Sequence, residues 1–213
     1  SLKDLEANGH LRFLFITGVS KFSKVSLFFD LNNLTDLSIH SLSHDLLGIT
    51  QDELIDNFGE RLPTIATKYK ITEEELLETI EIWYGGYSYN GKTQLYNPAS
   101  ILSFFQGQRF RSYWFDTGTP TFLVETVKNR DIKPEKYEQL KVDDIFLTNS
   151  SVDDINMTRL LFQTGYLTIK SITHRKSVFH YNLGYPNFEV QNAMMSNLVR
   201  LSSTKGFSQD QLF

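Results

Sequence analysis

Residues 72–86 read TEEELLETIEIWYGG, and this stretch decides the architecture in the middle of the chain. Thr72 and Glu75 have the spacing of a capping box, in which each side chain accepts a hydrogen bond from the other residue's backbone N–H. Apolar residues then recur at helical spacing and define one buried stripe: Leu76, Leu77, Ile80, Trp83 and Tyr84. Gly85 and Gly86 end the pattern, since glycine readily adopts the conformations that terminate helices. The stretch therefore predicts a helix.

The segments beside this helix carry a hairpin signal and further caps. Asn90 and Gly91 separate two short stretches of β-forming residues, 87–89 and 93–96, which predicts a hairpin. Asn97-Pro98 predicts the start of a helix with Ile101, Leu102 and Phe105 facing inward. Thr119-Pro120 predicts another, with Phe122, Leu123, Thr126 and Val127 on one face, and Thr50 is expected to cap a helix over residues 51–58.

The last third of the chain has the order helix, β-hairpin, helix. Met157, Leu160 and Leu161 predict a helix that ends at Gly165. Residues 166–172 and 178–181 are expected to be paired strands, with His174, Arg175 and Lys176 in the turn. Asn187 is expected to cap a final helix whose inward face carries Val190, Ala193, Met194, Leu198 and Leu201. This order is compatible with a winged-helix module.

The predicted fold class is mostly α with small β elements, that is, α+β. We expect three regions: residues 1–36, a remnant of a core sheet; residues 37–144, a helical lid; and residues 145–204, the winged-helix-like unit. The charged segment 128–144 is expected to link the second and third regions.

Composition describes an ordinary globular protein of 213 residues, with 40% hydrophobic and 22% charged residues. The absence of cysteine excludes disulfides, thiolate metal sites and a cysteine nucleophile. No apolar run approaches the ~20 residues that span a bilayer, and the first residues do not resemble a signal peptide. We therefore expect a cytoplasmic protein without membrane partners. The net charge of −4 argues against extensive coating of nucleic acid.

The apolar run over residues 11–17 predicts a strand buried on both faces, as in a parallel sheet. Few candidate partner strands follow it, which suggests that the chain begins in the middle of a domain.

Residues 86–93 match the phosphate-binding pattern G-x-x-x-x-G-K-[ST] letter for letter. A working phosphate loop follows a buried strand and opens a helix. Here a helical stripe precedes the match, and Pro98 stands where the second turn of the helix should be. We interpret the match as a hairpin turn.

Seven phrases in order resemble a bacterial AAA-ATPase-like family that often carries a C-terminal PD-(D/E)xK nuclease-type domain. They are FITGVSKFSKVS (15–26), LNNLTD (31–36), WYGGY (83–87), YNP (96–98), YWFDTGTP (113–120), LFQTGYL (161–167) and LGYPN (183–187). The resemblance runs from about Arg12 to about Leu201.

The resemblance implies that the phosphate-binding loop and the acidic metal-site strand lie upstream of this chain. Residues 12–17 would be the sensor-1 strand, and the nuclease-type domain would begin near residue 200. ATP and magnesium are then expected only in the full-length protein, which supplies the missing N-terminal ATPase half. No catalytic residue, cofactor or metal site is expected in this chain, and the isolated chain is predicted to be inactive.

The resemblance places Thr17 and Ser20 where a polar sensor would meet the γ-phosphate, and Lys21 where a cation would neutralise it. Their alternatives are a loop-capping hydroxyl and a solvated lysine. Arg109 and Arg111 are candidate arginine fingers toward a neighbouring subunit, or else surface arginines.

Arg175 and Lys176 would suit a wing that contacts a DNA backbone, although turn chemistry alone also explains them. His40 and His44 have a metal-ligand spacing but lack a third ligand, so metal is not expected. Thr117 and Thr119 in the DTGTP phrase resemble an aspartic-protease triplet, which a helix cap explains better.

The leading functional hypothesis is therefore the C-terminal part of an AAA-ATPase-like nucleotide-binding protein. The alternative is a winged-helix module that binds DNA or another protein and has no enzymatic activity.

Overall fold

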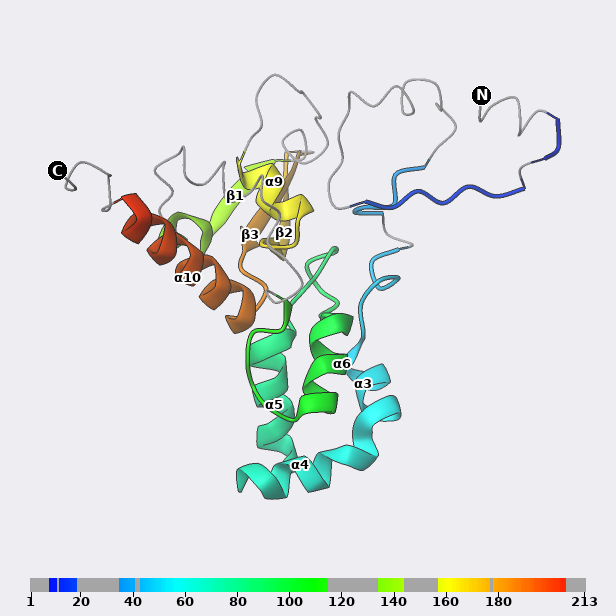
Figure 1. Ribbon diagram of the computed structural model, residues 1–213. Coiled ribbons are helices and arrows are strands. Elements are labelled where there is room, and N and C mark those ends of the chain that lie inside the picture. Colours follow the sequence, from blue (N-terminus) through cyan, green and yellow to red (C-terminus); the bar gives the residue numbers. More distant parts are fainter. Residues whose placement is uncertain are drawn as a thin grey trace.

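The computed structural model describes residues 8–10, 12–18, 35–40, 43–114, 134–143, 157–176 and 178–205. The described chain has an α+β fold, as predicted. A helical unit lies at one end, and a sheet with two helices lies at the other (Figure 1). No helix among the described residues combines the length and the apolar character needed to cross a bilayer.

The helical unit contains α3 (Gln51–Phe58), α4 (Leu62–Tyr69), α5 (Glu73–Tyr84) and α6 (Pro98–Gly107), with the short 3-10 helix η1 (Gly59–Arg61) between α3 and α4. The predicted caps are confirmed. Thr50 and Thr72 each form a complete capping box, with Glu53 and Glu75 respectively. Asn97 accepts hydrogen bonds from the backbone of residues 99 and 100 at the start of α6. Local sequence therefore determines where these three helices begin.

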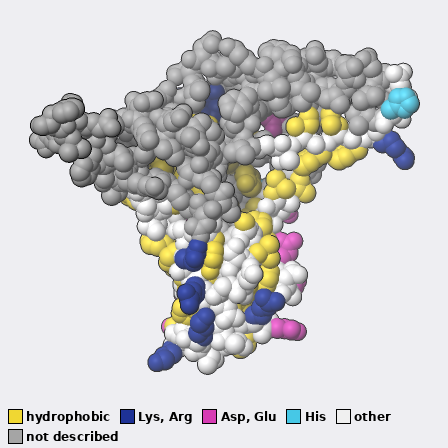
Figure 2. All heavy atoms as spheres, viewed as in Figure 1, with side chains coloured by type: hydrophobic (Ala, Val, Ile, Leu, Met, Phe, Trp, Pro, Cys, Tyr) yellow, Lys and Arg dark blue, Asp and Glu magenta, His cyan; other side chains and the backbone are white. Residues whose placement is uncertain are grey.

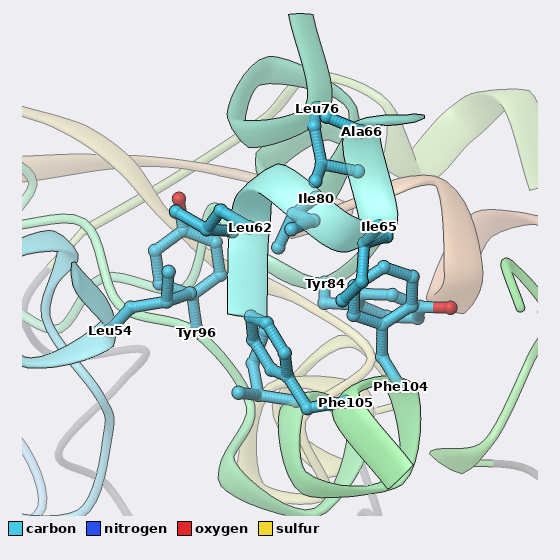
Figure 3. Packing of buried hydrophobic residues seen from close by; sticks show 11 residues of the cluster. Leu54, Leu62, Ile65, Ala66, Leu76, Ile80, Tyr84, Tyr96, Phe104 and Phe105 are labelled. Carbon is cyan, nitrogen blue, oxygen red and sulfur yellow. The ribbon is translucent and has the colours of Figure 1, made fainter. Parts of the chain in front are cut away.

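The four helices surround one aromatic and aliphatic core (Figure 3). Ile65, Ile80 and Tyr84 are completely buried in it. Phe104 and Phe105 close it from α6, and the Phe105 ring stacks on Phe58 at 4.3 Å. Leu102 was predicted to face inward, but it is 57% exposed, because the buried face of α6 passes through residues 100, 101, 104 and 105.

The second unit contains η3 (Pro134–Tyr137), β1 (Leu140–Asp143), α9 (Met157–Gln163), β2 (Thr168–Arg175), β3 (Val178–Gly184) and α10 (Phe188–Lys205). The predicted order helix, hairpin, helix is confirmed. The three strands form an antiparallel sheet in the order β1-β3-β2. The sheet and α9 lie beyond the upper end of α5, and α10 extends away from the helical unit (Figure 1).

Strand β1 corrects the prediction that residues 128–144 are only a linker. Leu140 pairs with Leu183, and Val142 pairs with Tyr181. Tyr137, just before the strand, is buried in the core formed by α9 and α10. The described part of this segment therefore belongs structurally to the second unit.

Residues 12–18 correct the prediction of a buried strand. They carry no strand pairing in the described structure, and Phe13, Phe15 and Ile16 are exposed. A strand requires a partner for its backbone N–H and C=O groups, and none of the described strands pairs with this segment. The predicted helix after Thr119 lies outside the described residues.

Candidate functional site

The segment 86–93, which carries the letters of a phosphate-binding loop, forms a closed chain reversal organised by Asn90. Asn90 Oδ1 accepts hydrogen bonds from the backbone N–H groups of Lys92 at 2.9 Å and Thr93 at 2.8 Å. Asn90 Nδ2 donates to the Thr93 hydroxyl at 3.0 Å. Two N–H groups that a phosphate loop would direct at its ligand are therefore engaged within the turn.

The first half of the same segment is engaged as well. Tyr87 and Leu95 exchange both backbone hydrogen bonds, at 3.1 and 2.8 Å. Ser88 N–H donates to the Thr168 hydroxyl at 2.7 Å, and that hydroxyl donates back to the Ser88 carbonyl at 2.8 Å. The predicted hairpin is confirmed as a chain reversal, closed by the Tyr87–Leu95 bridge.

Gly86 joins this loop to the second unit at a very close approach. Its φ is +77°, and a Cβ at this position would lie 2.1 Å from the Pro186 carbonyl oxygen. Lys170 Nζ donates to the same carbonyl at 2.9 Å, and partial burial lowers the pKa of its ammonium group. Glycine at position 86 therefore allows the backbone of residues 86–93 to pack directly against Pro186.

Five of the phrases that carry the family resemblance meet at this place. Asn187 Nδ2 donates to the Gly85 carbonyl at 2.8 Å, which joins LGYPN to WYGGY. The ring of Trp114, from the YWF phrase, lies 4.8 Å from that of Tyr166, in LFQTGYL. Asn97, in YNP, donates its backbone N–H to the Tyr84 carbonyl at 3.0 Å. We call this contact region the junction.

Glu189 is the central polar residue of the junction, and its side chain is buried to 1% exposure. Its carboxylate accepts hydrogen bonds from the Ser100 hydroxyl at 2.7 Å and from the backbone N–H groups of Tyr113 and Trp114. It stands in the first turn of α10, where a negative charge is favoured by the helix dipole. One carboxylate thus ties α10 to α6 and to the segment that follows α6.

That following segment, residues 108–114, carries the predicted arginine fingers. Both Arg109 and Arg111 are exposed. The Tyr84 hydroxyl donates to the Arg111 carbonyl at 3.0 Å and accepts from its N–H at 3.1 Å. Tyr113 Oη donates to the Arg109 carbonyl at 2.8 Å, and its ring lies 5.1 Å from the Arg111 guanidinium carbon. The backbone of the segment is fixed by side chains, while both arginine residues are exposed.

Of the three residues predicted in the β2–β3 turn, Lys176 lies in it, whereas His174 and Arg175 continue β2 and pair with Phe179 and Val178. Both basic residues are exposed, and Lys176 has a φ of 48°. Val178 and Phe179 beside them are 42% and 47% exposed. The turn lies at the end of the sheet away from Thr168, which contacts the helical unit, whereas Arg109 and Arg111 follow α6 in that unit, so the two basic pairs are not brought together.

The remaining predicted site residues are separated or lie outside the described residues. Thr17 is exposed within residues 12–18, while Ser20 and Lys21 fall outside the described part of the chain. The same holds for Thr117 and Thr119. Among the residues described, no group of three or more histidine or acidic side chains is arranged to hold a metal ion.

Sequence reasoning missed Glu189 and Tyr84 as organisers of the junction. The partners of Glu189 lie 75 to 89 residues away, so no local pattern reveals them. The available signal was the position of an acidic residue two places after a helix cap, next to the LGYPN phrase.

No protein-family model matches the chain, and no solved structure matches it. Over 198 residues, or 93% of its length, the chain is 40% identical to the "Uncharacterized protein in vnfD 5'region" of Azotobacter chroococcum mcd 1. The chain spans 36% of that protein's length.

Proposed function

We propose that this chain is the lid and winged-helix part of an AAA-ATPase-like nucleotide-binding protein, and that it does not hydrolyse ATP alone. The observation that supports this proposal is the hydrogen bonding of the backbone N–H groups in residues 86–93. Backbone N–H groups of this loop are engaged by Asn90, Leu95 and Thr168, so they are unavailable to a phosphate. ATP and magnesium would be held by the upstream half that the family resemblance implies.

The junction suggests what the chain contributes. Glu189, Asn187 and Thr168 connect the helical unit to the sheet unit through buried hydrogen bonds. Buried networks of this kind hold their partners in one arrangement. We therefore propose that the lid and the winged unit move as one body when the nucleotide-binding half changes state. Thr17, Ser20 and Lys21 as sensors, and Arg109 and Arg111 as arginine fingers, remain predictions of this proposal.

Calorimetric titration of Mg·ATP tests the proposal, with the wild-type chain and Lys92→Ala compared side by side. Neither is expected to bind nucleotide or to release phosphate. Binding that disappears in Lys92→Ala would contradict the proposal, because residues 86–93 would then be a working phosphate loop. The positive arm uses the full-length Azotobacter relative, which we expect to bind Mg·ATP; if it does not, the family assignment fails.

A second candidate function is DNA binding through the β2–β3 turn. Exposed Arg175 and Lys176 at the tip of a two-stranded hairpin support it, because such a tip can follow a phosphate backbone. The protein-interaction form of this alternative is supported by the exposed side chains of Val178 and Phe179.

Fluorescence anisotropy with labelled duplex DNA, at about 50 mM and about 200 mM salt, tests the DNA-binding candidate. Binding should weaken steeply with salt, and changing Arg175 and Lys176 together to Gln should lower the logarithmic salt slope by about 2. Lys136→Gln with Lys141→Gln removes the same charge elsewhere and should leave binding nearly unchanged. No binding at the lower salt would remove this candidate.

A further inference from the structure

The segment 108–114 is held along its length by side chains from three helices. Lys68 Nζ and Tyr69 Oη, on α4, both donate to the Gln108 carbonyl at 3.0 Å. Tyr84, on α5, binds both backbone groups of Arg111, and Glu189, on α10, receives the N–H groups of residues 113 and 114. An irregular segment with so many fixed backbone groups has little conformational entropy left to lose when it binds a partner.

Four cationic side chains are displayed on and beside this segment. Arg109 and Arg111 lie on it, Lys68 contacts its first residue, and Lys70 follows in the left-handed residue that caps α4. All four residues are exposed. Figure 2 shows several Lys and Arg side chains on one face of the helical unit. We call these four residues the basic ridge.

The ends of α4 and α6 account for only part of this charge. Cations near helix C-termini offset the negative end of the helix dipole, and Lys68 does so directly through the Gln108 carbonyl. Arg109 and Arg111 lie beyond the last turn of α6, and the dipole effect falls off within that turn. Helix ends therefore account for Lys68, in the last turn of α4, and for Lys70, its C-cap, but not for Arg109 and Arg111.

The surroundings of the basic ridge favour a phosphate polymer over a protein partner. Protein interfaces usually have an apolar core with exposed aromatic or aliphatic anchors. In the described chain, Leu102 on α6 is exposed, but no large exposed apolar side chain belongs to residues 61–70 or 103–114. The nearby aromatics are turned inward: Phe110 packs against Tyr69 at 5.3 Å and against Phe104 at 4.7 Å. Arginine, in contrast, matches phosphate oxygens well through its planar set of donors.

We propose that Lys68, Lys70, Arg109 and Arg111 form a pre-organised surface that binds the phosphate backbone of a nucleic acid. This surface lies on the helical unit, whereas the β2–β3 turn lies on the sheet unit, and it does not depend on nucleotide binding by any part of the protein. Binding through it is independent of base sequence, since its groups are suited to phosphate rather than to base edges.

The test measures the anisotropy of a labelled oligonucleotide of mixed sequence, single-stranded and duplex, with the full 213-residue chain. Arg109→Gln with Arg111→Gln should weaken binding about tenfold or more at about 50 mM salt, and should lower the salt slope by about 2. The charge-matched control is Lys136→Gln with Lys141→Gln, two exposed lysines on the second unit, which should retain wild-type affinity.

A second comparison separates this surface from the β2–β3 turn and from an acidic protein partner. If binding is lost with Arg175→Gln and Lys176→Gln but is unchanged with the Arg109/Arg111 variant, the basic ridge is not the contact. An equal loss in the charge-matched control would also overturn the proposal. Poly-glutamate that binds the ridge while the oligonucleotides do not would replace the nucleic acid by an acidic peptide.

A separate variant tests pre-organisation: it keeps the positive charges but removes the Tyr84 hydroxyl that fixes the backbone of Arg111, which we call the clamp. Tyr84→Phe keeps the buried ring but loses the hydroxyl that holds both backbone groups of Arg111. We expect weaker binding with an unchanged salt slope, because the number of phosphate contacts stays the same. Circular dichroism verifies that the variant is folded, and an affinity equal to the wild-type value would show that the clamp has no role in binding.

Discussion

Residues 86–93 and residues 108–114 are both irregular segments whose backbone groups are engaged by hydrogen bonds, but a phosphate loop binds through those backbone groups, whereas a basic surface binds through exposed side chains. In the first, the backbone N–H groups that the motif would need are engaged by Asn90, Leu95 and Thr168. In the second, the backbone is engaged, but the charged ends of Arg109 and Arg111 remain exposed. A phosphate-loop motif thus identifies a binding loop only if the fold leaves its backbone N–H groups accessible to the ligand.

Among the substitutions that test this comparison, Gly86→Ala should lower the free energy of unfolding most. The new Cβ would lie 2.1 Å from the Pro186 carbonyl oxygen, and the φ of +77° disfavours any side chain. We expect the free energy of unfolding to fall by about 4 kcal/mol, at the upper end for single substitutions. Urea denaturation followed by circular dichroism measures it.

Gly59→Ala is the matched control for this substitution. Gly59 lies in a right-handed helical conformation, and its added Cβ would make an ordinary contact at 3.7 Å with Ile55. It should raise stability slightly, by about 0.5 kcal/mol, because alanine has less freedom in the unfolded chain. If Gly86→Ala also left the free energy of unfolding unchanged, residues 86–93 would not be in tight contact with the second unit.

Glu189→Ala tests whether the Glu189 carboxylate holds residues 108–114 in place. Its carboxylate satisfies the Ser100 hydroxyl and the N–H groups of Tyr113 and Trp114 in a buried place. Removing it leaves these donors without their acceptor, so we expect a loss of about 3 kcal/mol in unfolding free energy. Glu78→Ala, on the exposed face of α5, should change stability by less than about 0.5 kcal/mol. A loss of similar size in both variants would remove the special role of Glu189.

Features that depend on neighbouring residues, such as helix caps, can be predicted from the sequence. Thr50, Thr72 and Asn97 mark helix starts through bonds to residues two or three places away, so the predicted caps are found. Helix α4 was missed because its N-cap, Arg61, makes no side-chain cap and its C-cap is Lys70 rather than glycine. Its local marks are weaker, namely Pro63 in the first turn and Lys68 in the last turn.

The junction could not be predicted, because its bonds join residues far apart in the chain. Strand β1 pairs with residues about 40 positions later, and its four residues alternate between partly buried and exposed without a turn signal. Asn187 was correctly predicted to cap α10, since its Oδ1 accepts from the Val190 N–H at 3.0 Å. Its second bond, to the Gly85 carbonyl 102 residues away, follows only from the tertiary structure.

Thr168→Val should have an intermediate effect, restricted to residues 86–93. Valine keeps the shape of the side chain but leaves the buried Ser88 N–H without its 2.7 Å acceptor. We expect a loss of about 2 kcal/mol in unfolding free energy. Thr173→Val, on an exposed position of the same strand, is the control and should be nearly neutral. Hydrogen exchange at Ser88 should quicken in the first variant only; unchanged exchange there would mean that the hydroxyl does not hold the loop.

Tyr84→Phe should have the smallest effect on the free energy of unfolding at neutral pH, because the hydroxyl that holds Arg111 contributes about 1 kcal/mol.

The pH dependence of the stability difference between Tyr84→Phe and the wild type is more informative. Burial raises the pKa of Tyr84 above its ordinary value of about 10, so the unfolded chain loses this proton first as the pH rises. The stability that the buried neutral phenol contributes is therefore complete below about pH 10 and is lost progressively as the pH rises from there toward the raised pKa of the folded protein. Phenylalanine has no such proton, so the stability difference between variant and wild type should narrow between about pH 7 and about pH 10.5. Urea midpoints at the two pH values measure this. A constant difference would mean that the hydroxyl is solvated in the folded protein, and residues 108–114 would then lack the internal clamp that distinguishes them from residues 86–93.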